Sequence, residues 1–159
     1  MNALTVEHEN TEGSEGIDPV TIDRQYINRF RLLKEDRKKR ILIIEDNRNL
    51  AELMSMIFED DGHVEIADNG SIGLSKVSKT YFDVIISDIE MPVMNGIEFF
   101  YQALKIYPGI GGKIVFCSGS SKEAHHRFIH KYCLRYLPKP YGIEELRGIV
   151  YDIMNDISQ

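Results

Sequence analysis

The chain has 159 residues, 43% of them hydrophobic, and a formal net charge of −6 at pH 7. One domain of ordinary size can bury a sizeable core at this length, which argues against two separate domains. The pI near 5.4 argues against broad nucleic-acid binding, because a protein that reads the phosphate backbone needs a cationic face.

No apolar stretch reaches the length needed to cross a bilayer, and the first residues, "MNALTVEHENTEGSEGIDP", lack the basic start and apolar centre of a signal peptide. We therefore expect a soluble, cytoplasmic protein. The two cysteines, Cys117 and Cys133, fall in an apolar run and an amphipathic segment, which favours reduced, buried thiols over a disulfide framework.

The amino-terminal part of the chain differs from the rest. Residues 1–19 carry little to bury, which predicts a disordered or loosely held tail. Apolar residues then recur at the spacing of an amphipathic helix over residues 21–35, namely Ile22, Tyr26, Phe30 and Leu33. The charged run "KEDRKKR" is interpreted as a solvated helix end rather than a nucleic-acid or membrane patch. Residues 1–39 are therefore expected to form an extension, and residues 40–159 the folded domain.

Five apolar segments with strand character alternate with helical patterns along this domain. The predicted strands are 40–44, 63–67, 82–87, 113–117 and 135–137. The predicted helices are 50–60, 71–80, 97–106, 122–132 and 143–157. Alternation of this kind predicts an α/β fold with a parallel sheet and right-handed crossovers, which gives a three-layer sandwich of helix, sheet and helix.

Apolar stripes predict which helix residues are buried, and glycine and proline residues predict where helices end. The first helix of the domain is expected to bury Leu50, Leu53, Met54, Ile57 and Phe58 and to end at Gly62. The last helix is expected to bury Leu146, Ile149, Val150, Ile153, Met154 and Ile157. The segment 107–112, which contains Pro108 and several glycines, is interpreted as a loop.

The stretch "DVIISDIEMPVMNG" at residues 83–96 changes character abruptly. Val84, Ile85 and Ile86 suit a strand that is buried on both faces, whereas Asp88 needs water or a cation. Both preferences are met if Asp88 lies at the carboxyl end of the strand, where open α/β sheets place their ligand crevices.

Polar side chains follow other strands in the same way. Glu45 and Asp46 follow "ILII", Ser118 follows "IVFC", and Lys139 follows "YLP". Together with Asp88 they are expected to meet at one edge of the sheet. Clustered carboxylates repel each other unless a cation binds among them, and hard oxygen ligands suit Mg²⁺.

This combination of groups is typical of phosphoryl transfer, which depends on positioning and charge neutralisation. Mg²⁺, the Lys139 ammonium and the Ser118 hydroxyl would each hold one phosphoryl oxygen. Asp88 would then attack phosphorus and become an acyl phosphate.

Four motifs together resemble the response-regulator receiver domain of two-component signalling. "IIED", "IISDIEMPVMNG", "FCSG" and "YLPKP" occur in the order and approximate spacing of that family. The resemblance covers about residues 40–157 and implies a flavodoxin-like, five-stranded parallel sheet with strand order 2-1-3-4-5. Since no output domain follows in this sequence, we expect a single-domain receiver in a phosphorelay, with output through protein binding.

The resemblance also implies a role for each residue at the strand ends. Asp88 is similar to the phosphoacceptor, and Glu45, Asp46 and Asp88 to the acidic set that binds Mg²⁺. Glu90 corresponds to the residue whose backbone carbonyl completes the metal shell. Lys139 is similar to the lysine that contacts the phosphoryl group, with a cis bond to Pro140.

Two further positions resemble the conformational switch of the family. Ser118 corresponds to the switch hydroxyl and Tyr136 to the aromatic residue that turns inward with it. The implied phosphodonors are a sensor histidine kinase or a histidine phosphotransfer protein, and the implied output is an altered face for a downstream protein. No enzymatic activity is expected beyond Mg²⁺-dependent self-phosphorylation and autodephosphorylation.

The sequence departs from the family pattern in a few places. Serine replaces the commoner threonine at Ser118, which keeps the hydroxyl. The segment between Ser118 and Lys139 is slightly short, so the helix within it is expected to be trimmed. Glu90 and Ser120 stand at positions that tune autodephosphorylation in the family.

Two other functions are alternatives to the receiver hypothesis. A phosphorylation-independent adaptor would keep the fold for binding alone, and the complete set of charged residues argues against it. An aspartate-nucleophile phosphatase would use Asp88 and Glu90, but such enzymes place their acidic pair after the first strand.

Three further features have ordinary interpretations or stay open. His126 and His130 have a zinc-compatible spacing, but without an evident third ligand they are interpreted as a solvated face. Cys117 is expected to be an inert buried thiol. The helix over 21–35 is expected to pack on the domain, to form a homodimer or to engage a partner, and these alternatives stay open.

Overall fold

The structure is a computed structural model that describes residues 38–119 and 122–155. Its strands are β1 (Lys39–Ile44), β2 (Gly62–Ala67), β3 (Val84–Asp88), β4 (Ile114–Ser118) and β5 (Arg135–Pro138). Its helices are α2 (Arg48–Phe58), α3 (Gly70–Val77), α4 (Gly96–Ile106), α5 (Glu123–Lys131) and α6 (Ile143–Met154), with a short 3₁₀ helix, η1 (Pro108–Lys113). The predicted tail, residues 1–19, and the predicted helix, residues 21–35, lie outside the described residues.

The five strands form one parallel sheet in the order β2-β1-β3-β4-β5, as predicted. The central strands β1, β3 and β4 are almost wholly buried, which explains their continuous apolar sequences. The register pairs Asp88 with Cys117 and Ser118 with Pro138, so the carboxyl ends of β3, β4 and β5 lie at one edge of the sheet.

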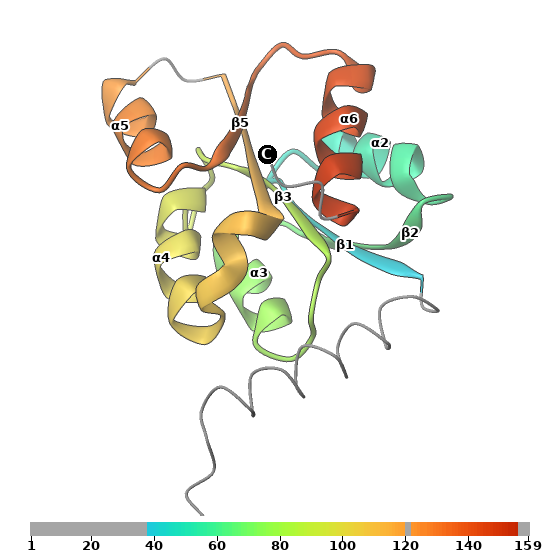
Figure 1. The fold of residues 1–159 in the computed structure, drawn as a ribbon, viewed down its shortest axis with the longest axis horizontal. Helices are drawn as coiled ribbons and strands as arrows, with labels where there is room; N and C mark the ends of the chain where they lie inside the picture. The colour runs from blue at the N-terminus through green and yellow to red at the C-terminus, as the bar shows by residue number, and fades with distance from the viewer. Residues whose placement is uncertain (1–37, 120–121, 156–159) are drawn as a thin grey trace, which may run out of the picture. The chain divides into compact units, whose positions relative to one another are not determined.

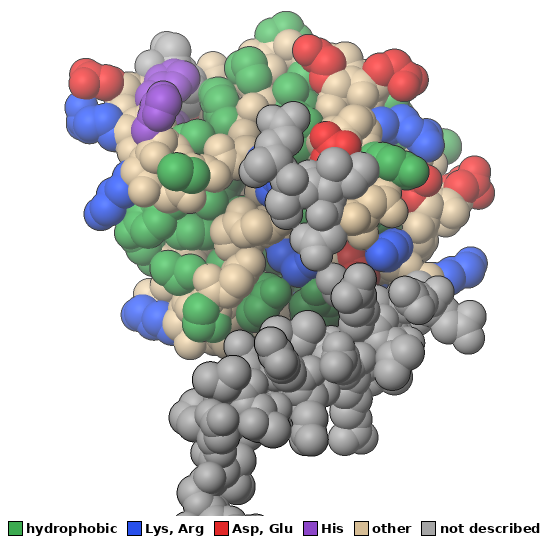
Figure 2. Space-filling view, in the orientation of Figure 1, with side chains coloured by type: hydrophobic (Ala, Val, Ile, Leu, Met, Phe, Trp, Pro, Cys, Tyr) green, Lys and Arg blue, Asp and Glu red, His purple; other side chains and the backbone are tan. Residues whose placement is uncertain are grey.

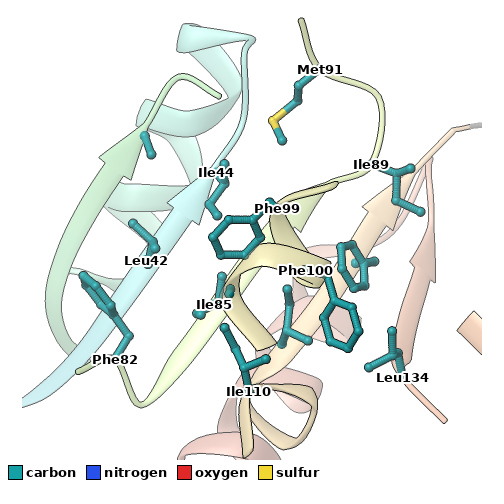
Figure 3. Close-up of a cluster of buried hydrophobic side chains, with 14 of the residues drawn as sticks. Leu42, Ile44, Phe82, Ile85, Ile89, Met91, Phe99, Phe100, Ile110 and Leu134 are labelled. Atoms are coloured by element: carbon teal, nitrogen blue, oxygen red, sulfur yellow. The ribbon is translucent and has the colours of Figure 1, made fainter. Parts of the chain in front are cut away.

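Helices cover both faces of the sheet. Figure 1 shows α2 and α6 on one side and α3, α4 and α5 on the other. Phe58 and Val150 pack with Ile43 in the first layer. In the second layer, Ile44, Ile85 and Phe99 point into one cluster from β1, β3 and α4 (Figure 3). The three-layer α/β sandwich is therefore confirmed.

Most predicted element boundaries agree with the structure to within three residues, but some details were wrong. The helix predicted over 50–60 begins at Arg48, because Asn47 caps it by accepting from the Leu50 amide, and it ends at Phe58. Gly62 does not end this helix. It begins β2, where a Cβ atom would lie 2.5 Å from the Lys39 carbonyl oxygen, so glycine permits the strands to pair there.

The prediction that Leu53 is buried was wrong, since 50% of its surface is exposed. The apolar stripe of α2 is narrower than its sequence suggests because the helix packs on the sheet through Ala51, Met54 and Phe58. The prediction that Cys133 is buried was also wrong, since it is exposed just past the end of α5, where its φ is 50°.

The strand predicted over 82–87 is shifted toward its carboxyl end. Phe82 and Asp83 precede β3, and the buried Asp83 carboxylate accepts a hydrogen bond of 2.8 Å from the Arg40 amide. The loop predicted over 107–112 is partly wrong, because η1 begins at Pro108 and anchors the buried Ile110. In the part of the chain that the structure describes, no helix has both the length and the apolar character needed to span a bilayer.

Candidate functional site

The site lies where β1, β3 and β5 end. The Lys139 Nζ atom lies 2.8 Å from Asp88 Oδ2 and 3.0 Å from Glu45 Oε2, so one ammonium bridges two carboxylates. Glu45 is almost fully buried, with 3% of its side chain exposed, whereas Asp88 and Lys139 are partly open to solvent at 12% and 23%. The predicted convergence of Glu45, Asp88 and Lys139 is present.

The exposed Asp46 completes an acidic group. One carboxylate oxygen each from Glu45, Asp46 and Asp88 lies within 4.8 Å of the others. With all three ionised, Lys139 compensates only one of the negative charges. The oxygen-only donor set and the remaining charge fit a hard divalent cation such as Mg²⁺.

The loop after β3 orients the Asp88 carboxylate. Its Oδ1 atom accepts hydrogen bonds from the amides of Ile89, at 2.6 Å, and Glu90, at 3.2 Å. The chain then turns back, and the Gly96 amide donates to the Ile89 carbonyl at 2.9 Å. A Cβ atom on Gly96 would overlap the Asp88 carbonyl oxygen, so this close return requires glycine.

Asn95, which precedes this glycine, caps the next helix. Its side chain accepts from the Glu98 amide at 2.9 Å, while the Glu98 carboxylate accepts from the Asn95 amide at 3.0 Å. This reciprocal capping box starts α4 immediately after the site loop. The "NG" pair thus ends the loop in a fixed geometry.

Burial and charge act against each other at the site. Burial raises the pKa of the Glu45 carboxyl above its ordinary value, although the hydrogen bond from Lys139 opposes this. Burial acts to lower the pKa of Lys139, but its hydrogen bonds to Asp88 and Glu45 outweigh that effect, and the pKa is raised. Lys139 therefore stays a cation at neutral pH.

The two predicted switch residues, Ser118 and Tyr136, are joined by a hydrogen bond to a backbone carbonyl. Ser118 is buried, and its carbonyl oxygen accepts from the Tyr136 hydroxyl at 3.2 Å and from the Lys139 amide at 2.9 Å. The half-buried Tyr136 ring also meets the His126 ring of α5 edge-on, with centroids 5.7 Å apart. The end of β4 is thus linked both to the lysine and to α5.

Glu90 is not part of the acidic group in this structure. Its carboxylate forms an ion pair with Lys122, which stands just before α5. Sequence reasoning missed Lys122, because no periodicity or motif ties it to a residue 32 positions away. Ser120, the second predicted tuning position, lies outside the described residues.

Two alternative chemistries receive little support from the geometry. Cys117 is buried, as predicted, and burial raises the pKa of its thiol to about 12, which disfavours the nucleophilic thiolate at neutral pH. Neither His126 nor His130 belongs to a group of three potential metal ligands among the residues that the structure describes. The bond between Lys139 and Pro140 is cis, as predicted.

The fold and the site define a class of protein: a flavodoxin-like α/β domain with an acidic, lysine-containing pocket at the carboxyl edge of its sheet. Comparison with known proteins identifies the family. A family model described as the response regulator receiver domain matches residues 41–151. The chain belongs to the response regulator receiver domain family.

Individual relatives agree with this assignment. A response regulator receiver protein of Anaeromyxobacter sp. (strain Fw109-5) is 34% identical over 111 residues, which cover 68% of this chain and 45% of that protein. A CheY-like receiver domain protein from Methanospirillum hungatei JF-1 has a TM-score of 0.69 at 26% identity, covering 75% of this chain and 95% of that chain. TrrA from Thermotoga maritima, solved in complex with Mg²⁺ and BeF, has a TM-score of 0.62 at 27% identity, covering 72% and 98%. The chain thus spans less than half the length of the Anaeromyxobacter relative.

Proposed function

We propose that this chain is a phosphorylation-switched signalling receiver that accepts a phosphoryl group on Asp88. The donor would be a phosphohistidine of a sensor kinase or of a phosphotransfer protein, and the output would be altered binding to a downstream protein. The observation that carries the proposal is the position of Lys139 Nζ, within hydrogen-bond distance of both Asp88 and Glu45.

The chemistry follows from the groups around Asp88. A carboxylate oxygen of Asp88 attacks phosphorus, the bond between phosphorus and the donor imidazole nitrogen breaks, and an acyl phosphate forms while neutral imidazole leaves after taking up a proton. The Ile89 and Glu90 amides hold the carboxylate in place during the attack. Lys139 stabilises the negative charge on the transferred phosphoryl group, because its ammonium already lies beside the Oδ2 atom of Asp88.

Glu45, Asp46 and Asp88 are the residues that would hold Mg²⁺, with the backbone carbonyl of Glu90 as a further ligand. Bound Mg²⁺ would supply charge neutralisation for the incoming phosphoryl oxygens. TrrA, a relative of similar fold, was solved with Mg²⁺ and BeF, which supports this assignment by analogy.

Signalling would use the link from Ser118 to Tyr136. A new phosphoryl group beside Lys139 gives the Ser118 hydroxyl an acceptor, and movement of Ser118 changes the carbonyl to which Tyr136 donates. The face formed by α5, β5 and α6 would respond as a shift between two existing conformations.

The test is phosphorylation by acetyl phosphate with and without Mg²⁺, followed by intact-mass measurement and peptide mapping. Wild type should gain one phosphoryl group at Asp88 only when Mg²⁺ is present, and Asp88→Asn should gain none. Asp60→Asn, which changes an exposed acid beyond α2, should behave as wild type.

A label on another residue, or labelling that ignores Mg²⁺, would contradict the proposed chemistry. Normal signalling by Asp88→Asn in the cell would favour the phosphorylation-independent adaptor. Steady turnover of a generic phosphomonoester would instead indicate a phosphatase.

A further inference from the structure

A hollow of about 280 Å³ lies between the end of α2 and α6, and none of the residues that line it belongs to the strand-end site. Phe58 and Met154 contribute apolar surface to it, and both are largely buried in the core beneath. Tyr151 also lines the hollow, with 60% of its surface exposed. A largely apolar depression thus opens beside an exposed aromatic ring.

A glycine in α6 keeps this hollow open. Gly148 lines it, and a Cβ atom built there would meet no other heavy atom within 4 Å. Glycine in the middle of a helix destabilises it relative to alanine. Packing within the described residues does not require Gly148, so its effect is to leave a notch on the surface of α6.

The rim of the hollow carries unpaired negative charge. Glu144 and Asp152 line it and, within the described residues, form no ion pair or hydrogen bond through their carboxylates. Arg147 reaches toward α2, where it donates to the Ile57 carbonyl at 3.4 Å and pairs with Asp61 at 3.4 Å. Figure 2 shows acidic side chains, with cationic ones among them, over α2 and α6.

We propose that this hollow is a docking site for a cationic amphipathic helix of a partner protein. Glu144 and Asp152 are eight positions apart on α6, which corresponds to about 12 Å along the helix axis. A partner helix lying along α6 would place one large apolar side chain in the notch at Gly148. Two cationic side chains, one turn to either side, would then meet Glu144 and Asp152, with Tyr151 available for a cation–π contact.

Charge also decides against a second copy of this chain as the occupant. A symmetric contact through this face would bring the same acidic rim against itself, and the chain already has a net charge of −6. A cationic partner would instead be attracted by the acidic rim. This docking does not require phosphorylation of Asp88.

The test uses a capped helical peptide with the pattern Arg-x-x-x-Leu-x-x-x-Arg in an Ala/Gln background, and a matched peptide with Glu in place of both Arg. Binding to the full chain is measured without phosphodonor by amide chemical-shift perturbation. We expect the Arg peptide to shift resonances of α6 and of the end of α2, and the Glu peptide to shift none.

Variants separate shape from charge. Gly148→Leu fills the hollow but keeps every charge, and it should weaken binding of the Arg peptide at least about tenfold, as loss of a central anchor does. Gly112→Leu, at another glycine with open space around its Cβ, should bind as wild type. Glu144→Gln combined with Asp152→Asn should weaken binding and flatten its salt dependence.

Equal binding by wild type and Gly148→Leu, or equal binding of the two peptides, would overturn the proposal. A dimer that Gly148→Leu abolishes would also overturn it, in favour of a second copy. Because no outcome depends on acetyl phosphate, failure here is distinguishable from failure of phosphorylation at Asp88.

Discussion

Val93 is held in the left-handed region of the backbone, with φ of 70°, in the loop that follows Asp88. A β-branched residue is strained there, because its Cβ approaches the carbonyl oxygen, and 83% of its surface is exposed, so burial offers no compensation. The neighbouring loop contacts explain the strain. The Met94 amide donates to the Pro92 carbonyl, and the Met94 carbonyl accepts from Gly70.

Replacing Val93 should therefore stabilise the protein. Val93→Asn is expected to raise the free energy of unfolding by about 1 kcal/mol, because asparagine tolerates this conformation. Urea denaturation measures the change. Val93→Ala also removes the β-branch but lacks the side-chain amide that hydrogen-bonds locally in this conformation, so it should recover less of the gain. An equal gain in both variants would show that the loss of the β-branch alone is the cause.

At the scale of elements, α5 (Glu123–Lys131) is the most lightly anchored helix of the site. All of its residues are described, and only Phe128 is buried. Phe128 packs edge-on against Phe100 and Phe116, with centroids 5.3 and 5.6 Å away. A helix with a single fully buried side chain can move without disrupting the rest of the core, which suits the conformational shift proposed for this face.

Removing this anchor should loosen α5 selectively. Phe128→Ala is expected to cost about 3 kcal/mol of unfolding free energy, and amide hydrogen exchange in α5 should accelerate more than in α6. Phe58→Ala, which empties the opposite layer beneath α2, is the control and should not single out α5. Uniform acceleration over all helices in Phe128→Ala would mean that α5 unfolds only with the whole domain.

Glu65 joins three elements on the outer edge of the sheet. Its two carboxylate oxygens accept hydrogen bonds of 2.7 Å from Arg40 of β1 and from Lys76 of α3. The bond from Lys76, followed in weight by the bond from Arg40, lowers the pKa of Glu65 below its usual range against the effect of burial. The folded state therefore binds the proton less tightly than the unfolded chain does.

This shift predicts a pH-dependent contribution to stability. A lowered folded pKa stabilises the fold above the unfolded value of about 4.3, and the contribution is lost as pH falls through the folded pKa. Glu65→Gln should cost about 1 kcal/mol at pH 7, and denaturation curves of mutant and wild type should approach each other below about pH 4. Glu52→Gln, which breaks a single exposed pair with Arg48, should cost less at every pH.

At the scale of the whole molecule, the site brings together side chains from the ends of three strands, and its carboxylates repel each other. Glu45, Asp46 and Asp88 share one small volume with a single compensating Lys139. A cation bound there only in the folded state should stabilise the entire domain by mass action.

Mg²⁺ at ten times its dissociation constant should accordingly raise the free energy of unfolding by about 1.4 kcal/mol. Thermal denaturation with and without Mg²⁺ measures this effect. Asp46→Asn should abolish the increase, because it removes one of the three carboxylates of the acidic group. Asp46 is exposed, so its replacement leaves the core intact. A response of Asp46→Asn equal to that of wild type would place the stabilising cation elsewhere.

Local sequence pattern determined the elements and the positions of the polar residues. Branched apolar runs predict β1, β3 and β4. Glu45 and Ser118 follow their runs directly and Asp88 follows after one serine, so their place at the strand ends needs no tertiary information. The motifs then sufficed to suggest the receiver family, whose model matches the chain.

The sequence predicted a shared edge of the sheet for the polar residues, but only the tertiary structure decided which of their atoms form bonds. Lys139 bonds to Asp88 and Glu45 across 51 and 94 positions of sequence, and these distances follow from strand order and register, not from periodicity. The ion pair of Glu90 with Lys122 was invisible in the sequence for the same reason. A local pattern says which face of an element is apolar, but the packing of helices on the sheet decides which polar groups are brought within reach of each other.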